Sequence, residues 1–249
     1  MDLLILLAVF LLGFVTMFFG AISGGVGLIT RPILIFMGFP SNAVIASSKV
    51  AGFIGDLPGL YLLNRHNRVD WKIVLFLIIP MTLGTVIASI AVLTFLKGSL
   101  DFILGILLLF AGFFLLFKSK IGIIEKPKTA LGIRTKIISF CLTLPVSFLN
   151  TISGGLGPIF NLLYIWIYKK TFISASALGR IASNISSIFS VIIFIIGRIV
   201  DWQLCLSLMA GFALGSYFGT KFGLKKGESF IRYIIIIVAF LGAIKLLFL

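Results

Sequence analysis

The sequence predicts an all-α integral membrane protein made of two tandem repeats, and three observations support this prediction. Of the 249 residues, 60% are hydrophobic and 11% are charged, and the mean hydropathy is +1.24. Several uncharged stretches reach the length of about 20 residues that a membrane helix needs, and one glycine-rich phrase occurs twice. The runs of Leu, Ile, Phe and Val lack strand-like alternation, so they favour helices over a membrane barrel.

The duplication extends along most of the chain. Residues 21–27 read AISGGVG, and residues 151–157, 130 positions later, read TISGGLG. KVA at 49–51 is then matched by RIA at 180–182. The expected division is a first transmembrane repeat at 1–118, a basic cytoplasmic linker at 119–133 and a second transmembrane repeat at 134–249.

Each repeat holds five apolar segments in the same order. The second segment of each repeat has about a dozen residues, too few to cross a hydrocarbon core alone. It is either re-entrant, which gives four crossings per repeat and a parallel duplication, or it completes a crossing begun at the glycines, which gives five crossings and an inverted duplication. Pro58 and Pro80 predict kinks. The segments are 3–22, 28–39, 43–63, 72–96 and 100–118, then 134–152, 158–168, 174–196, 203–220 and 230–249.

The 21 Lys and Arg residues distinguish the two topologies. With five crossings per repeat, fifteen of them collect on one face and three on the other, whereas four crossings give a weak split of about eleven to seven. Because positive loops stay in the cytoplasm, the sequence predicts an inverted five-plus-five protein of the cytoplasmic membrane with both termini outside. The net charge of +14 then comes from Lys and Arg residues in loops that lie beside anionic lipid. No nucleic acid partner is therefore expected.

Other reactive groups are sparse. Cys141 and Cys205 lie in apolar runs and are expected to be packing residues, and the single histidine, His66, is expected in a solvated loop. No metal site, cofactor site or nucleophile constellation can be assembled. We therefore expect neither a cofactor nor an enzyme activity.

Both glycine segments are candidates for an anion site. At each one a helix stops inside the membrane and a short helix begins, and the free N–H groups at a helix start attract anions. Small residues could instead serve close helix packing, but two copies, each followed by a basic residue, favour binding. The candidates are Ser23, Gly24, Gly25 and Gly27, with Ser153, Gly154, Gly155 and Gly157 in the second copy.

Three basic residues fall inside the apolar segments: Arg31, Lys49 and Arg180, with Asn161 roughly at the place of Arg31. A charge near the bilayer centre costs about 2.5–3.5 kcal/mol on insertion scales, so it is expected to face a cavity or a partner. Snorkelling to the interface is the alternative for Arg31. Inverted symmetry should bring Lys49 and Arg180 together near the midplane, in a pocket that attracts anions.

Asp56 is the one acid within an apolar run. Three roles are open for it: a counter-ion to an intramembrane base, a protonatable coupling group that would make protons the coupling ion, or a solvated loop acid. The second repeat has Ser187 at the matching place.

These residues resemble the sulfite exporter TauE/SafE family of membrane permeases. The resemblance rests on Gly24-Gly25-Val26-Gly27 followed by Pro32, on Ala46-Ser47-Ser48, and on a weaker second copy interrupted by Leu156, with Leu162 where a proline is expected. It implies transport of small, often sulfur-containing anions such as sulfite, sulfonates or thiosulfate. The substrate within that class, the direction of transport and the oligomeric state stay open.

The expected function is a secondary transporter that moves a small anion by alternating access. A passive anion channel is the alternative, because it would use the same cationic pocket.

Overall fold

The computed structural model describes residues 2–66, 69–94 and 132–226, apart from the side chains of Ile22, Ser23 and Lys226. The part of the chain so described is helical and contains no strand, as expected for an all-α membrane protein. The predicted segments 100–118 and 230–249, and nearly all of the linker at 119–133, lie outside the described residues.

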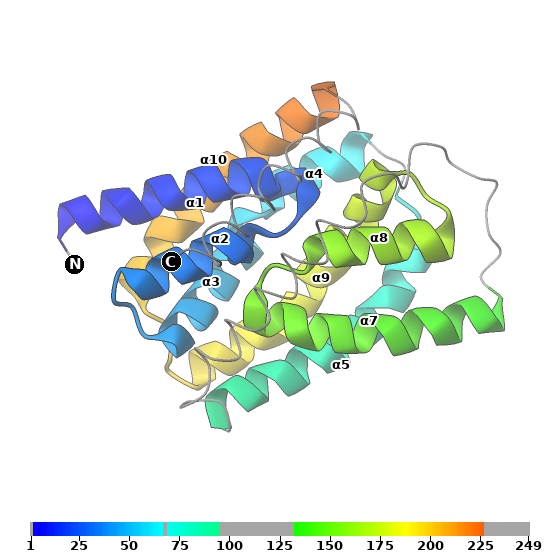
Figure 1. The fold of residues 1–249 in the computed structure, drawn as a ribbon, viewed down its shortest axis with the longest axis horizontal. Coiled ribbons are helices and arrows are strands. Elements are labelled where there is room, and N and C mark those ends of the chain that lie inside the picture. Colours follow the sequence, from blue (N-terminus) through cyan, green and yellow to red (C-terminus); the bar gives the residue numbers. More distant parts are fainter. Residues whose placement is uncertain (1, 67–68, 95–131, 227–249) are drawn as a thin grey trace, which may run out of the picture.

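The helices follow the predicted segments closely in both halves of the chain (Figure 1). The first half contains α1 (Leu3–Ser23), α2 (Val26–Phe36), α3 (Ser41–Gly55), α4 (Leu57–His66) and α5 (Trp71–Thr94). The second half contains α7 (Ile133–Ser153), α8 (Gly157–Tyr168), α9 (Phe172–Ile196) and α10 (Trp202–Lys226).

One predicted segment is not a single continuous helix, so that prediction is wrong. The segment at 43–63 is two helices, because α3 ends at Gly55 and α4 begins at Leu57. The cause is Pro58, which has no N–H to donate to the carbonyl one turn earlier. Pro80, in contrast, lies inside an unbroken α5.

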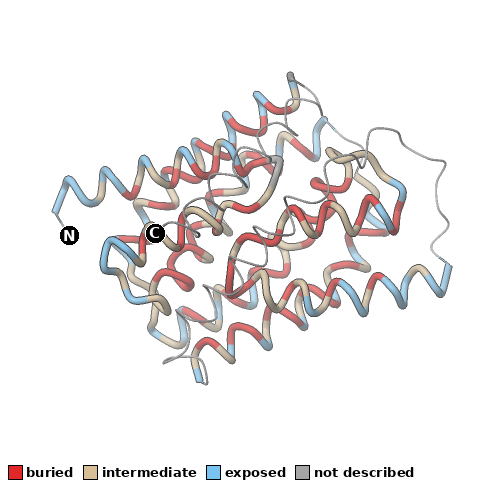
Figure 2. Tube along the Cα trace, in the orientation of Figure 1, coloured by how far each residue is buried: buried red, intermediate tan, exposed pale blue. Residues whose placement is uncertain are grey.

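Four helices of the described ranges, α1, α5, α7 and α9, are long and apolar enough to cross a membrane. With 25 residues α10 is as long as α9, but its glycines and polar residues make it less apolar. Large apolar side chains such as Leu4, Leu75 and Ile196 are exposed on the outside, while buried positions face the interior of the bundle (Figure 2). An apolar exterior of this kind suits lipid, so the chain is an integral membrane protein.

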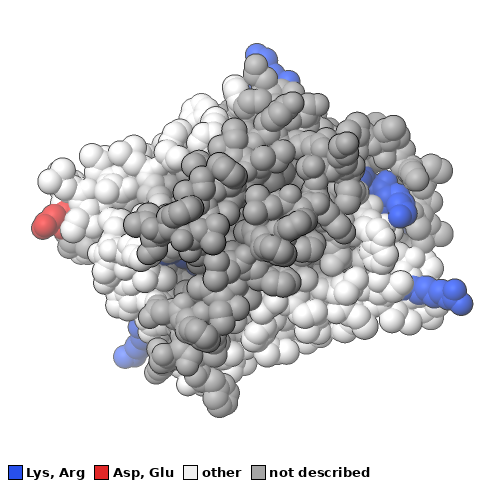
Figure 3. Space-filling view, viewed as in Figure 1, with Lys and Arg blue, Asp and Glu red and all other residues white. Residues whose placement is uncertain are grey.

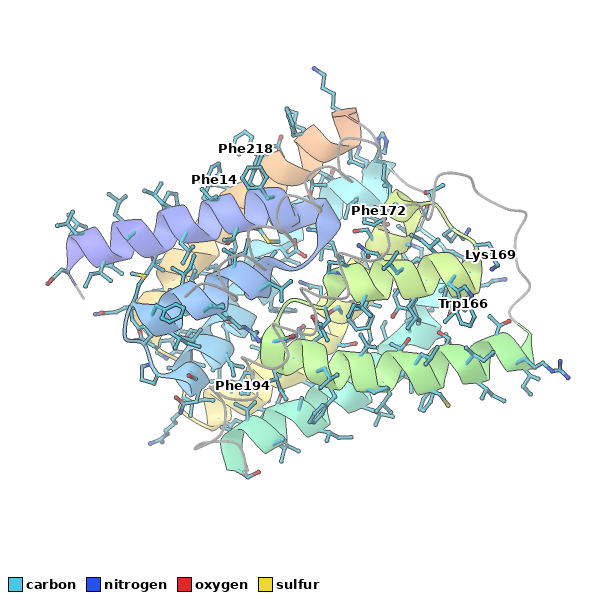
Figure 4. All side chains as sticks on the ribbon, in the orientation of Figure 1. Phe14, Trp166, Lys169, Phe172, Phe194 and Phe218 are labelled. Carbon is cyan, nitrogen blue, oxygen red and sulfur yellow. The ribbon has the colours of Figure 1, made fainter. Side chains whose placement is uncertain are left out.

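The two halves of the chain are interleaved. The first helix of the first half, α1, packs along α10, while the first helix of the second half, α7, packs along α5. Likewise α3 packs on α10, and α9 packs on α5. Figure 4 labels Phe14 on α1 and Phe218 on α10, the two helices that pack along each other. Each half therefore completes its packing with helices of the other half.

The connections gather at two opposite ends of the molecule (Figure 1). Toward the upper right lie the end of α4, the start of α7, the α8–α9 connection and the end of α10. Toward the lower left lie the N-terminus, the α2–α3 connection, the end of α5 and the α9–α10 connection. In the space-filling view the visible Lys and Arg side chains also stand mainly toward the ends (Figure 3).

Candidate functional site

A cavity of about 180 Å³ lies inside the bundle where the two glycine segments meet. A cavity needs about 10–15 Å³ to hold one water, so this one has room for a small hydrated solute. Its wall comes from α1, α2, α3, α7, α8, α9 and α10, and therefore from both halves of the chain. Of the predicted site residues, it contains Gly24, Gly25, Gly27, Arg31, Lys49, Asp56, Gly154, Gly157, Asn161 and Arg180.

The glycine segments touch each other directly. Gly27 donates its N–H to the carbonyl of Gly154 at 3.0 Å. A Cβ on Gly24 would lie 2.7 Å from the Cα of Gly157, and Gly24 has a φ of +79°, so only glycine fits there. Close packing, one of the two alternatives for these glycines, therefore occurs here, and because they also line the cavity, anion binding stays a prediction.

Two predicted residues of the second segment lie beside the cavity rather than in its wall. Ser153 is fully buried, and its hydroxyl accepts from the N–H of Gly155 at 3.4 Å. A Cβ on Gly155 would meet the Leu28 side chain at 2.2 Å, so Gly155 serves packing against α2. The side chain of the matching Ser23 lies outside the described residues.

The short helices start at the cavity, but some of their N–H groups are already used. Gly25, Val26 and Gly27 at the start of α2 line the cavity, and so does Gly157 at the start of α8. Besides the Gly27 bond, the N–H of Leu156 donates to Oδ1 of Asn150 at 2.9 Å. The positive ends of both helices thus face the cavity with only part of their donors available.

Arg31 of α2 is 3% exposed, which contradicts the snorkelling alternative. Its Nε donates to the Ser48 hydroxyl at 3.1 Å, and its Nη1 donates to the carbonyls of Thr151, at 3.0 Å, and Ile152. Both carbonyls belong to the last turn of α7, the negative end of that helix dipole. Arg31 therefore caps the end of a helix from the other half of the chain.

Arg180 of α9 does the same for α1, since its Nη1 donates to the carbonyl of Ala21. Its guanidinium also forms a two-pronged ion pair with Asp56, through Nη2 to Oδ1 and Nε to Oδ2. The Ser216 hydroxyl of α10 donates to the same carboxylate at 2.7 Å. The side chain of Asp56 is 14% exposed, so it is the counter-ion of Arg180, and the solvated-loop alternative is wrong.

Lys49 of α3 lines the same cavity and is half-buried. Among the described residues it makes no hydrogen bond and no ion pair, unlike the two arginines. The nearby positive charge of Arg31 repels the ammonium group of Lys49. Lys49 therefore contributes an uncompensated positive charge to the cavity.

Several polar residues of the wall had not been predicted. Asn184 of α9 donates from Nδ2 to the carbonyl of Phe53 at 3.0 Å, which ties α9 to α3 beside the cavity. An amide in the uncharged run at 181–197 was a usable sequence signal, since polar groups inside a membrane tend to mark functional sites. The others are Thr30, Ser48, Asn150, Ser176, Ser183 and Ser187.

Within the described ranges, no group of His, Cys, Asp and Glu is arranged to hold a metal ion. Cys205 is buried, as a packing residue should be, but Cys141 is exposed on the outside of α7 and that part of the prediction is wrong. His66 is exposed, as expected, but it is the last residue of helix α4 and does not lie in a loop.

Comparison with known proteins agrees with the membrane architecture. A family model described as "Sulfite exporter TauE/SafE" matches residues 9–246. A "Probable membrane transporter protein" of Haemophilus influenzae is 28% identical over 251 residues, which cover 99% of this chain and 95% of the relative. The "Probable membrane transporter protein YfcA" of Escherichia coli K12 is 27% identical, with 98% of this chain and 90% of the relative covered.

A third relative, the "Probable membrane transporter protein ORF9" of a Sinorhizobium species, is 26% identical and covers 96% of this chain and 90% of its own length. No solved structure matches the chain significantly. The family match spans nearly the whole chain and confirms the resemblance seen in the glycine segments. The chain therefore belongs to the sulfite exporter TauE/SafE family of membrane transporters.

Proposed function

We propose that this protein is a secondary transporter that moves a small anion across the cytoplasmic membrane by alternating access. The observation that carries the proposal is the cavity, whose wall holds three cations and one acid. Excess positive charge in a low-dielectric interior attracts an anion strongly. The two short helices, α2 and α8, add the positive ends of their dipoles.

The substrate class we propose is a sulfur-containing anion such as sulfite, a sulfonate or thiosulfate. The family description supports it, whereas the three relatives are described only as membrane transporters. A cavity of about 180 Å³ suits an anion of this size.

An inverted duplication, with repeats at 1–118 and 134–249, supports the alternating-access part of the proposal. The matching helix ends of the two halves, the end of α4 and the end of α9, lie at opposite ends of the molecule, as an inverted duplication requires (Figure 1). The packing of α1 on α10 has its counterpart in the packing of α7 on α5. Inverted repeats around a central site let a protein open to either side in turn.

Asp56 is the proposed coupling group. In its ionised form it holds Arg180, and a proton on Asp56 would weaken that ion pair. Because Arg180 joins α9 to the end of α1, protonation could loosen the contact between the two halves. Proton and anion would then move together.

Counterflow in vesicles tests the proposal. The purified full chain is reconstituted with unlabelled sulfite or thiosulfate inside, and uptake of the labelled anion is followed. A transporter gives saturable uptake that internal substrate accelerates. Uptake that rises linearly with concentration and shows no counterflow would favour the channel alternative.

A further inference from the structure

We infer that Lys49 holds the charge of the transported anion, whereas Arg31 and Arg180 use their guanidinium groups mainly to hold helix ends. This inference rests on the proposed function and deepens it. The sequence alone placed Lys49 and Arg180 together in one anion pocket, and the hydrogen bonds of the structure distinguish them.

The two arginines are engaged by groups of the protein. Arg31 gives Nε to a hydroxyl and Nη1 to two carbonyls at the end of α7. Arg180 gives Nε and Nη2 to Asp56 and Nη1 to the carbonyl at the end of α1. An anion that displaced these bonds would leave buried carbonyls or a carboxylate without a donor, which is costly. Of the two guanidinium groups, only that of Arg31 keeps a nitrogen, Nη2, outside the bonds made among the described residues.

Lys49 has the opposite environment. Its ammonium has no hydrogen bond or ion pair among the described residues, although it lines the cavity. An unpaired cation inside a membrane protein is unfavourable, and a bound anion removes that cost. Asn150 lines the same cavity, and since its Oδ1 already accepts from Leu156, its amide NH₂ is the end that can donate to an anion.

The charges make the two sides of the cavity unequal. Asp56 neutralises Arg180 on one side, while no described carboxylate lies within ion-pair distance of Arg31 or Lys49 on the other. The same asymmetry is present in the sequence, because the second half has Ser187 at the position that matches Asp56. The anion therefore sits off the pseudo-symmetry axis, beside Lys49.

The same charges limit the kind of anion. A zwitterion, such as an aminosulfonate, needs a carboxylate for its ammonium group. Among the described residues of the cavity wall, the one acid is engaged with Arg180. The site thus fits a simple oxyanion without a cationic group, such as sulfite, thiosulfate or an unsubstituted alkyl sulfonate.

Binding measurements on the purified full chain test the assignment. Sulfite, thiosulfate, ethanesulfonate and 2-aminoethanesulfonate are titrated, and the shift of the unfolding midpoint gives the affinity. Lys49→Gln should weaken binding of the simple oxyanions by roughly 10- to 100-fold, the loss of one charge-assisted contact. Lys49→Arg should keep most of the affinity, and 2-aminoethanesulfonate should bind the parent at least about tenfold more weakly than ethanesulfonate.

Lys221→Gln, which removes a lysine from the exposed face of α10, is the matched control and should bind like the parent. Without ligand, Lys49→Gln should unfold at the same temperature as the parent or higher, because it removes an unpaired charge. Equal affinity of the parent and Lys49→Gln would overturn the assignment of Lys49 alone. A parent that binds none of the four anions would refute the proposed function itself.

Discussion

At the scale of single residues, the two buried arginines work as long-range helix caps. Arg31 and Thr151 are 120 positions apart in sequence, and Arg180 and Ala21 are 159 apart, yet each guanidinium meets the carbonyl end of the first helix of the opposite half. Inside a membrane these carbonyls have no water to satisfy them. A charged donor that reaches them therefore stabilises a helix end in the bilayer interior.

Asp56→Asn tests the coupling role at this scale. In vesicles, transport by the parent should increase as the pH falls, because protonation of Asp56 loosens its ion pair with Arg180. The asparagine variant should still bind the anion, since Lys49 is unchanged, but its transport should not depend on pH.

Asp70→Asn, at the start of α5 and outside the cavity wall, is the control and should keep the pH profile of the parent. An unchanged profile in Asp56→Asn would reduce Asp56 to a structural counter-ion.

At the scale of elements, three glycines of α10 bring this helix close to α1. A Cβ on Gly211, Gly215 or Gly219 would approach the carbonyl oxygens of α1 to 2.3, 2.5 and 2.2 Å. Small residues spaced by four let two helix backbones approach closely where lipid gives no hydrophobic force between helices. The three glycines thus fix the first helix of one half on a helix of the other.

Gly215→Ala should lower stability, because the new methyl group would lie 2.5 Å from the carbonyl oxygen of Phe14 and the two backbones must separate. We expect a loss of about 1–3 kcal/mol, typical of overpacking, seen as a lower unfolding midpoint in detergent. Gly52→Ala is the control, since nothing lies within 4 Å of its Cβ position. Alanine there should be neutral or slightly stabilising in α3.

At the scale of the whole molecule, the exposed tryptophans agree with the distribution of the connections. Trp71 begins α5 and Trp202 begins α10, and the two helix starts lie at opposite ends of the molecule (Figure 1). Both side chains are about half exposed, at 47% and 52%. Tryptophans at both ends of the helices are typical of the two membrane interfaces.

Terminal reporter fusions test the orientation. With an inverted five-plus-five topology and fifteen basic residues on the inner face, a reporter active only outside the cytoplasm should work at both the N-terminus and the C-terminus. A reporter inserted at 119–133 should work only in the cytoplasm. Cytoplasmic activity at both termini would instead support the parallel arrangement with four crossings per repeat.

The sequence by itself determined that the protein lies in a membrane, where most helices lie in the chain, and where the candidate site lies. Apolar length and the absence of strand-like alternation are local properties, so most helices begin and end within a few residues of the predicted segments. The repeated glycines and the isolated charges also pointed to the residues that line the cavity. The exception among the helices is the segment at 43–63. Pro58 was expected to kink this helix, but the helix is broken at Asp56.

The tertiary structure alone decided which partners the charged residues of the cavity wall have. Asp56 and Arg180 are 124 positions apart, and no local pattern predicts that this pair forms while Lys49 is left without a partner. The same holds for Gly155, whose burial depends on Leu28 and the approach of α2. A hydrogen bond depends on atomic positions set by the packing of helices from both halves, and sequence spacing carries no information about them.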